Sequence, residues 1–261
     1  MKVGVIGAGS AQFLFELAEL CALGEVGDYE VAMFDTDSHR LGAVAAFGER
    51  VATEMGVPAR ISTASELRIA VDGADAVVVS IGVGQQESIR PDFEIPARYG
   101  LRQTVADTCG IGAVVRLLRT APALAEIAGE MARSAPGAPL LNGTNPMAMC
   151  CMATNRLVPE VATIGLCHST WITAGEIARH LEIPADELEW GGVGVNHQVF
   201  ISRLSHRGVD LYPRLRAMAE DDTPFARSVR ADLIQVMAAM FRAWLMHPMR
   251  QHLLSRAAHY K

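Results

Sequence analysis

The sequence has few of the features that mark nucleic-acid-binding or membrane proteins. Its 261 residues contain 23 lysines and arginines against 29 aspartates and glutamates, which gives a formal net charge of −6. Because phosphate groups are bound by a basic face, this balance argues against a nucleic-acid partner. No apolar run approaches the roughly 20 residues that cross a bilayer, and the glycine-broken start, Met1–Gly7, lacks the pattern of a signal peptide. We therefore expect neither a nucleic-acid nor a membrane partner.

Cysteine is also scarce. The five cysteines are an odd number and lack the spacing of a disulfide framework, so a reduced, cytoplasmic protein is expected. Half of the residues are apolar, which excludes a disordered chain and predicts a sizeable core. Four cysteines are expected to be small buried hydrophobic residues: Cys21, Cys109, Cys150 and Cys151. The fifth, Cys167, stands beside a histidine and directly follows a strand-like run.

Carboxylates are missing from the last part of the chain. Residues 233–261 contain arginines, histidines and methionines but no aspartate or glutamate. The surfaces of soluble domains ordinarily mix both signs of charge. This part of the sequence is therefore unlike the rest of the chain.

Short apolar runs that alternate with amphipathic stretches predict an α/β fold. The predicted strands cover residues 3–6, 30–34, 76–81, 139–141 and 163–166, and the predicted helices cover 11–23, 41–55 and 111–134, the last interrupted at Pro122. After residue 170 the pattern changes to a helix, a helical turn, a strand-like stretch and a long helix, at 174–181, 184–188, 193–204 and 224–245. We expect a Rossmann-like doubly wound parallel sheet over residues 1–168, followed by an incomplete α+β substrate domain over residues 169–261.

The turn after the first predicted strand has part of a dinucleotide-binding fingerprint. Gly7 permits a tight turn, and Gly9 with the adjoining Ser10 would let the backbone approach a pyrophosphate at a helix N-terminus. The third glycine of the fingerprint is missing. Asp35 ends the second predicted strand, where an acid binds the ribose and favours NAD over NADP, and Asp37 is a nearby alternative. A tight strand–helix turn without a cofactor is the competing interpretation.

Two side chains with metal-binding chemistry follow strand-like runs. Cys167 and His197 could bind one divalent ion, and sulfur with imidazole favours a transition metal over Mg²⁺. Two ligands so far apart in sequence are a poor motif alone. A buried thiol and a hydrogen-bonded core histidine remain the alternative.

Several longer motifs resemble glycoside hydrolase family 4. They are Asn145–Met149, Gly165–Ser169 and Gly194–His197, and the similarity extends through residues 89–95, 99–104, 106–108 and 118–122. The resemblance implies a Rossmann-like domain that uses NAD and a divalent metal, usually Mn²⁺. The Cys-His-Ser sequence is most similar to the α-galactosidase (melibiase) and α-galacturonidase members. It implies a non-phosphorylated α-hexoside or α-uronide substrate, with an α-galactoside favoured.

The resemblance also implies a mechanism and residue roles. NAD takes a hydride from sugar C3, a base removes the C2 proton while the metal stabilises the charge, and the leaving group departs from C1. Cys167 and His197 would ligate the metal, and His168 would be the acid. Asn145 would also contact the nicotinamide ribose. The substrate-side residues would be Asn145, Arg90 and Asn196, with Asp92 as a further candidate beside Arg90. An exposed loop ion pair is the alternative for Arg90 and Asp92.

The family resemblance also bears on the length of the chain. Family members are longer and carry their base as a tyrosine after the helix predicted here at 224–245, and the glutamate–tyrosine pair of that segment is absent. We therefore expect a C-terminally truncated chain with little or no hydrolase activity, whose full-length relatives are homo-oligomers. The alternatives are an NAD-dependent 2-hydroxy-acid dehydrogenase of the lactate/malate type, which needs no thiolate ligand, and a non-catalytic NAD-binding relic.

Overall fold

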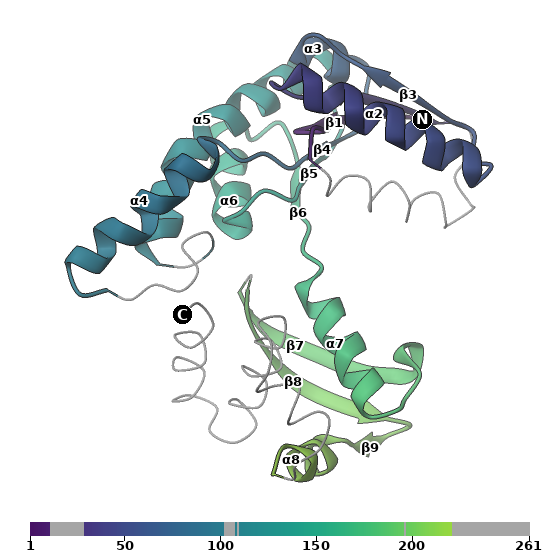
Figure 1. Ribbon diagram of the computed structural model, residues 1–261, viewed down its shortest axis with the longest axis vertical. Helices are drawn as coiled ribbons and strands as arrows, with labels where there is room; N and C mark the ends of the chain where they lie inside the picture. The colour runs from purple at the N-terminus through teal and green to yellow at the C-terminus, as the bar shows by residue number, and fades with distance from the viewer. Residues whose placement is uncertain (11–28, 102–107, 109, 196, 221–261) are drawn as a thin grey trace. The chain divides into compact units, whose positions relative to one another are not determined.

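The computed structural model describes residues 1–10, 29–101, 108, 110–195 and 197–220, and it divides into two compact units (Figure 1). The first unit comprises Met1–Arg90 and Ala113–Leu166, and the second comprises Pro91–Gly112 and Cys167–Lys261. Among the described residues, no helix is both long enough and apolar enough to span a bilayer. The proposed domain division at residue 168 stays a prediction.

A six-stranded parallel sheet forms the centre of the first unit. Its strands are β1 (Lys2–Ile6), β2 (Tyr29–Phe34), β3 (Ala59–Thr63), β4 (Ala76–Val79), β5 (Leu140–Asn142) and β6 (Thr163–Gly165). Their order is β3-β2-β1-β4-β5-β6, and every neighbouring pair is parallel. This is the doubly wound order whose switch point lies between β1 and β4. It confirms the Rossmann-like sheet that the sequence predicts.

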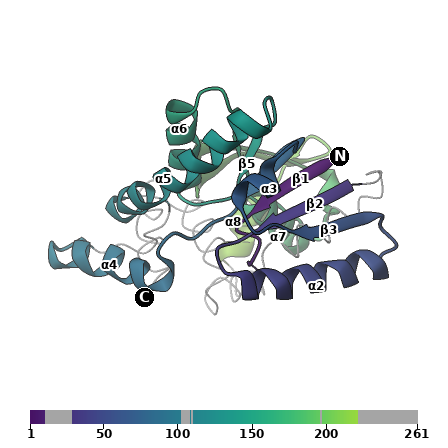
Figure 2. The same cartoon turned by 90° about the horizontal axis from the view of Figure 1, so that it is seen from above.

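Helices cover both faces of this sheet (Figure 2). On one face, α2 (Ser38–Glu54) packs Leu41 and Ala45 against Val5 of β1. The other face is covered by α3 (Leu67–Val71), α5 (Ile111–Ser134) and α6 (Met147–Leu157), which pack around Ile6 and Val77. Neighbouring residues of β1 thus enter opposite cores, and this two-sided burial explains why the strands are short continuous apolar runs.

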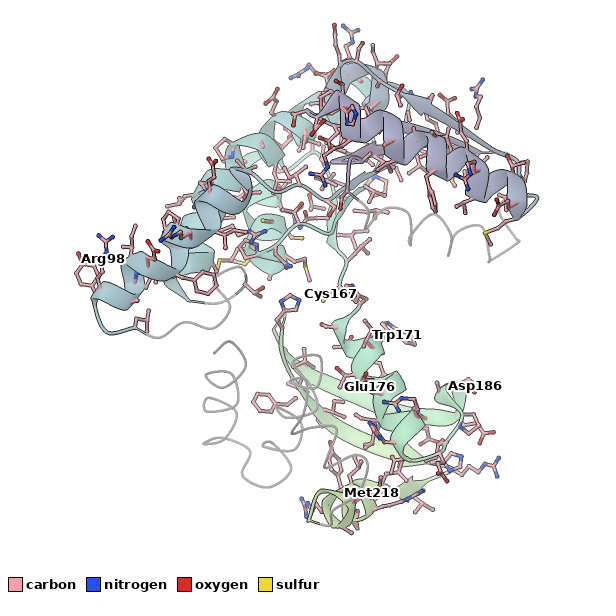
Figure 3. All side chains as sticks on the ribbon, in the orientation of Figure 1. Arg98, Cys167, Trp171, Glu176, Asp186 and Met218 are labelled. Atoms are coloured by element: carbon pink, nitrogen blue, oxygen red, sulfur yellow. The ribbon has the colours of Figure 1, made fainter. Side chains whose placement is uncertain are left out.

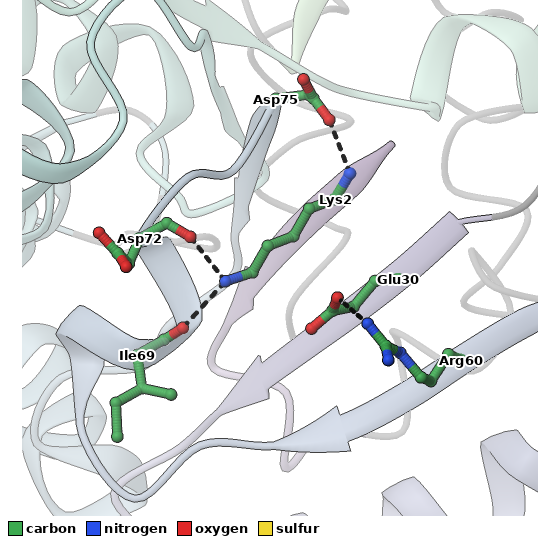
Figure 4. Close-up of polar contacts among 6 residues, drawn as sticks. All are labelled: Lys2, Glu30, Arg60, Ile69, Asp72 and Asp75. Carbon is green, nitrogen blue, oxygen red and sulfur yellow. Dashed lines mark hydrogen bonds and ion pairs between the residues drawn. The ribbon is translucent and has the colours of Figure 1, made fainter.

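Polar contacts fix the amino-terminal end of β1 (Figure 4). The Lys2 backbone N–H donates to Oδ2 of Asp75 at 2.7 Å. The Lys2 Nζ donates to the carbonyl oxygens of Asp72 at 2.6 Å and of Ile69 at 3.1 Å. These bonds hold β1 to the connection between α3 and β4, so they fix the strand whose other end leads into the glycine turn.

The interruption expected at Pro122 is wrong. The helix α5 runs from Ile111 to Ser134 with Pro122 inside it. A proline within a helix removes one hydrogen bond and crowds the preceding turn, at a cost of about 3 kcal/mol. The apolar face nevertheless continues beyond Pro122 through Leu124, Ile127 and Met131, all buried in the core. Burial of side chains of this size outweighs the local penalty of one proline, at roughly 1.5–3 kcal/mol each.

The second unit contains a helix packed on an antiparallel sheet. Its elements are α7 (Ser169–His180), a short 3₁₀ turn (Ala185–Glu187), β7 (Leu188–Val195), β8 (Gln198–His206), β9 (Val209–Asp210) and α8 (Tyr212–Glu220), with sheet order β7-β8-β9. Ala174 and Ile177 of α7 and its C-cap residue Leu181 pack against Leu188 and Leu204 of the hairpin. The recurrence of these positions every three or four residues gives α7 one apolar face.

The strand-like stretch expected at 193–204 is in fact two strands. Val195 of β7 pairs with Gln198 of β8, so the chain reverses between these two residues, with His197 in the turn. An apolar run of β-forming residues does not reveal where a hairpin reverses unless turn residues mark the place. The helices expected at 11–23 and 224–245 lie outside the described residues. The sequence missed β3, α3, α4 (Gln85–Arg98), α6, β9 and α8.

Candidate functional site

The turn after β1 has a backbone conformation that requires glycine. Gly7 has a φ of 84°, and a Cβ placed there would lie 2.1 Å from the carbonyl oxygen of Ser80. The Gly7 N–H donates to the carbonyl of Phe34 at 2.9 Å, and the Ser10 N–H donates to the Gly7 carbonyl at 3.3 Å. The turn is therefore held close to the carboxyl ends of both β2 and β4, where dinucleotides bind in folds of this topology.

The carboxylate of Asp35 lies directly against this turn. Its Oδ2 accepts a hydrogen bond from the Gly9 N–H at 2.8 Å, and its Oδ1 accepts one from the Asp37 N–H at 2.9 Å. A Cβ on Gly9 would lie 2.8 Å from the same Oδ2. Asp37 instead caps α2, because its Oδ1 accepts from the Arg40 N–H at 3.0 Å. Of the two acids, Asp35 is thus the one placed beside the glycine turn.

Asn145 stands at the same edge of the sheet, after β5. Thr144 Oγ1 accepts a hydrogen bond from the Ile81 N–H at 2.9 Å, which ties the ends of β4 and β5 together. Asn142 and Thr144 are buried and hydrogen-bonded to each other. The Asn145 Oδ1 accepts from the Met147 N–H at 3.3 Å, which leaves the amide NH₂ available to a ligand. Gly7, Gly9, Asp35 and Asn145 therefore line one carboxyl edge, and this edge fits a dinucleotide.

The structure brings Cys167 and His197 together in the second unit. Cys167 lies between β6 and α7, at the N-terminal end of α7 (Figure 3). His197 occupies the turn between β7 and β8. The His197 side chain lies within reach of the Cys167 thiol and favours its ionised form, and the Cys167 Sγ lies 3.0 Å from the Ser169 Oγ. The side chains that the sequence singled out as metal-binding candidates thus meet.

The environment of Cys167 favours the thiolate. The hydrogen bond with His197 is the largest cause that lowers the pKa of this thiol, to about 6, with further hydrogen bonds from Ser169. Partial burial opposes this shift but does not cancel it. In contrast, burial raises the pKa of the Cys150 thiol to about 12. Because the thiolate is the form that binds metals, Cys167 has the chemistry of a ligand and Cys150 that of a core residue.

His197 is held in an uncommon backbone conformation. Its φ is 59°, in the left-handed region that few residues other than glycine adopt. Its Nδ1 is hydrogen-bonded to the Oγ1 of Thr108 at 2.8 Å. The role of Thr108 was missed by sequence reasoning, where the only signal was its place in the Ala106–Thr108 motif.

For the other predicted site residues, His168, Arg90 and Asn196, the structure gives fewer contacts. His168 adjoins Cys167 as the N-cap residue of α7; its side chain is exposed and its carbonyl accepts from the Ile172 N–H at 3.0 Å. Arg90 is exposed on α4. Asn196 lies outside the described residues. The second unit thus unites Cys167, His168 and His197, whereas the cofactor residues belong to the first unit.

Two protein donors are available for a metal in the described part of the chain. Within residues 1–10, 29–101, 108, 110–195 and 197–220, no group of three or more histidine, cysteine, aspartate or glutamate side chains could hold a metal ion. The Cys167–His197 pair supplies one thiolate and one imidazole, which suit a transition metal.

Comparison with known protein families and proteins gives consistent matches. The model described as family 4 glycosyl hydrolase matches residues 2–183, and the model of the family's C-terminal domain matches residues 192–260. An alpha-galactosidase from Bacillus subtilis is 37% identical over 222 residues, which cover 84% of this chain and 51% of that protein. An alpha-galacturonidase from the same organism is 31% identical over 223 residues, which cover 83% and 49%. The chain spans about half the length of the curated relatives it matches.

Solved structures share the fold. A Bacillus subtilis protein named as a glucosidase aligns with a TM-score of 0.79 at 25% identity, over 97% of this chain and 62% of that one. A 6-phospho-alpha-glucosidase from gut microorganisms, solved with NAD and Mn²⁺, has the same TM-score and coverage at 21% identity. The malate dehydrogenase of Picrophilus torridus aligns with a TM-score of 0.61 at 16% identity, over 82% of this chain and 61% of that one. At the two lower identities the likeness concerns the fold alone.

Proposed function

Because the chain belongs to family 4 of the glycosyl hydrolases, we propose that it acts as a glycosidase on a non-phosphorylated α-hexoside or α-uronide. The observation that carries this proposal is the contact between Cys167 and His197, since it creates a thiolate–imidazole pair suited to a transition metal. Relatives named alpha-galactosidase and alpha-galacturonidase, at 37% and 31% identity, support this substrate class. Galactose, galacturonate and glucuronate stay open, with an α-galactoside favoured.

NAD is the proposed cofactor of the first unit. Gly7 and Gly9 would leave room for the pyrophosphate beside Ser10, and Asp35 would accept hydrogen bonds from the ribose hydroxyls. Asn145 would donate from its free amide to the nicotinamide ribose or to a sugar hydroxyl. A 2′-phosphate would be repelled by the Asp35 carboxylate, so NAD is favoured over NADP.

Mn²⁺ or another divalent metal is the proposed partner of Cys167 and His197. In the bound state NAD would supply a hydride acceptor and the metal a Lewis acid for the sugar oxygens. His168, adjacent to the ligand Cys167, would give a proton to the leaving-group oxygen, as a histidine can near neutral pH. Arg90 and Asn196 would bind sugar hydroxyls on the substrate side.

We also propose a cellular compartment and partners for the protein. A thiolate ligand has to stay reduced, which suits the cytoplasm, and Cys150, Cys151 and Cys167 are all free thiols. We also propose that the protein forms a homo-oligomer, as expected of its longer relatives, and that its small-molecule partner is the glycoside. A lactate/malate-type dehydrogenase is disfavoured, because that chemistry gives no role to the Cys167–His197 pair.

Glycoside cleavage with cofactor omission tests the proposal. The measurement is release of p-nitrophenol from its α-galactoside, α-galacturonide and α-glucuronide, with NAD⁺, Mn²⁺ and a thiol reductant present. In line with the little or no hydrolase activity expected from the sequence, we expect weak release at most, best from the α-galactoside, and we expect omission of either NAD⁺ or Mn²⁺ to abolish it. Cys167→Ser should behave like omission of the metal. Release that persists without NAD⁺, or metal-independent oxidation of NADH by keto acids, would show that the function is a different one.

A further inference from the structure

Thr108 and His197 meet across 89 residues of sequence. The Thr108 Oγ1 lies 2.8 Å from the Nδ1 of His197, and the threonine is only 5% exposed. Both residues belong to the second unit. Because Nδ1 is engaged by Thr108, Nε2 is the ring nitrogen through which His197 could act on a second partner such as Cys167.

The position of His197 makes such a hydrogen bond necessary. The residue lies in the turn of the β7–β8 hairpin, in the left-handed backbone region. The torsion that rotates an imidazole about its bond to Cβ is broad and roughly two-fold, so packing alone orients the ring weakly. A flipped ring would turn Cε1 rather than Nε2 towards Cys167. A hydrogen bond at Nδ1 removes this ambiguity.

The chemistry of a hydroxyl suits this task. A threonine hydroxyl can donate one hydrogen bond and can also accept, so it satisfies Nδ1 whether or not that nitrogen carries a proton. Histidines that ligate metals commonly have a hydrogen-bond partner on the second ring nitrogen, and loss of such a partner weakens metal binding by about 10–100-fold. Thr108 would thus contribute to the site through the ring of His197.

We propose that Thr108 is a positioning residue whose hydroxyl holds the His197 imidazole with Nε2 directed towards the Cys167 thiolate. Its consequence for metal affinity rests on the proposed function, in which Cys167 and His197 are the protein ligands of the metal. The orientation of the ring does not depend on that function. The two parts can therefore be tested separately.

The first test measures the ring in the metal-free protein. Heteronuclear NMR of protein labelled with ¹⁵N-histidine detects the ring nitrogens, and the His197 signals are assigned by their loss in His197→Gln. Thr108→Val, which removes the hydroxyl but keeps the shape, should shift the Nδ1 signal. Thr108→Ser should retain the parent signal. Thr154→Val is the matched control, since Thr154 is equally buried and its hydroxyl bonds the Cys150 carbonyl at 2.9 Å.

The second test measures Mn²⁺ affinity by competition with a chelator. Thr108→Val should weaken binding about 10–100-fold, whereas Thr108→Ser and Thr154→Val should bind as the parent does. Thermal unfolding checks that each variant folds, and Thr108→Ala replaces Thr108→Val if the valine prevents folding.

The outcomes separate the two claims. An unchanged His197 ring signal in Thr108→Val, together with parent-like Mn²⁺ affinity, would overturn the positioning role. A parent protein that binds no Mn²⁺, with a His197 signal that still depends on Thr108, would refute the proposed metal site and support the positioning role.

Discussion

The backbone N–H of Gly9 donates a 2.8 Å hydrogen bond to Oδ2 of Asp35, across the gap between the ends of β1 and β2. The glycine turn and the Asp35 carboxylate are therefore directly linked, so a change in one affects the other. The same oxygen lies 2.8 Å from the point where a Gly9 side chain would begin. Any group larger than hydrogen at this position displaces the carboxylate, and this close approach makes the first two predictions specific.

Gly9→Ala should weaken NAD binding and lower stability together. The added methyl would contact the Oδ2 and Cγ of Asp35 at 2.8 and 2.9 Å, so we expect a loss of about 1–3 kcal/mol in the free energy of unfolding. Gly42→Ala is the control, because nothing lies within 4 Å of its Cβ and it is exposed in α2. That change should stabilise by about 0.5–1 kcal/mol. Calorimetric NAD titration and thermal unfolding give both quantities, and parent-like NAD affinity in Gly9→Ala would refute the cofactor role of this turn.

Asp35→Asn should reduce the preference for NAD over NADP. Loss of a charged acceptor for the ribose hydroxyls costs about 1.5–3 kcal/mol, which corresponds to at least a tenfold weaker NAD affinity. NADP affinity should fall less, because the repulsion of the 2′-phosphate is removed as well. Asp37→Asn is the matched control, since asparagine caps a helix as well as aspartate does. Equal effects of the two substitutions on the ratio of dissociation constants would argue against Asp35.

Cys167 should be alkylated rapidly in the metal-free protein at neutral pH. With a pKa lowered to about 6, mainly by the His197 hydrogen bond, the thiolate fraction rises through pH 6 and is nearly complete above pH 7. The rate with iodoacetamide, followed at Cys167 by peptide mass spectrometry, should follow this curve. Cys150 should stay unreactive, since its pKa is raised to about 12. His197→Gln should move the midpoint upward, and an unchanged midpoint would mean that His197 does not stabilise the thiolate.

Mn²⁺ should protect Cys167 from the same reagent. A thiolate bound to a metal is a poorer nucleophile because its lone pair is engaged, so saturating Mn²⁺ should slow alkylation, and EDTA should restore it. The protection should depend on His197 and should be lost in His197→Gln. Mg²⁺ should protect less, because hard oxygen ligands suit it better than sulfur. Equal alkylation rates with and without Mn²⁺ would speak against Cys167 as a ligand.

Much of the fold could be predicted because its signals are local. Runs such as Ala76–Val79 are apolar on both faces, which predicts a buried strand. The glycine turn directly follows β1 and Asp35 directly follows β2, so both can be recognised from the adjoining sequence. The predicted helix break at Pro122 was wrong, because the prediction considered the local cost of a proline in a helix but not the free energy gained when the apolar face of α5 is buried in the core. The hairpin between β7 and β8 was read as one strand because β-forming residues continue almost to the turn.

The sequence by itself determined the alternation of strands and helices, the glycine turn with its acid, and the chemical types of Cys167 and His197. These are properties of neighbouring residues, fixed by backbone sterics and by apolar periodicity. Only the tertiary structure decided that Thr108 bonds the His197 ring, and it placed close together Cys167 and His197, which the family resemblance had assigned to one metal. Such contacts depend on how separate elements pack. Cys167 and Thr108 lie 30 and 89 residues from His197 in sequence, so no local sequence pattern predicts the geometry of these contacts.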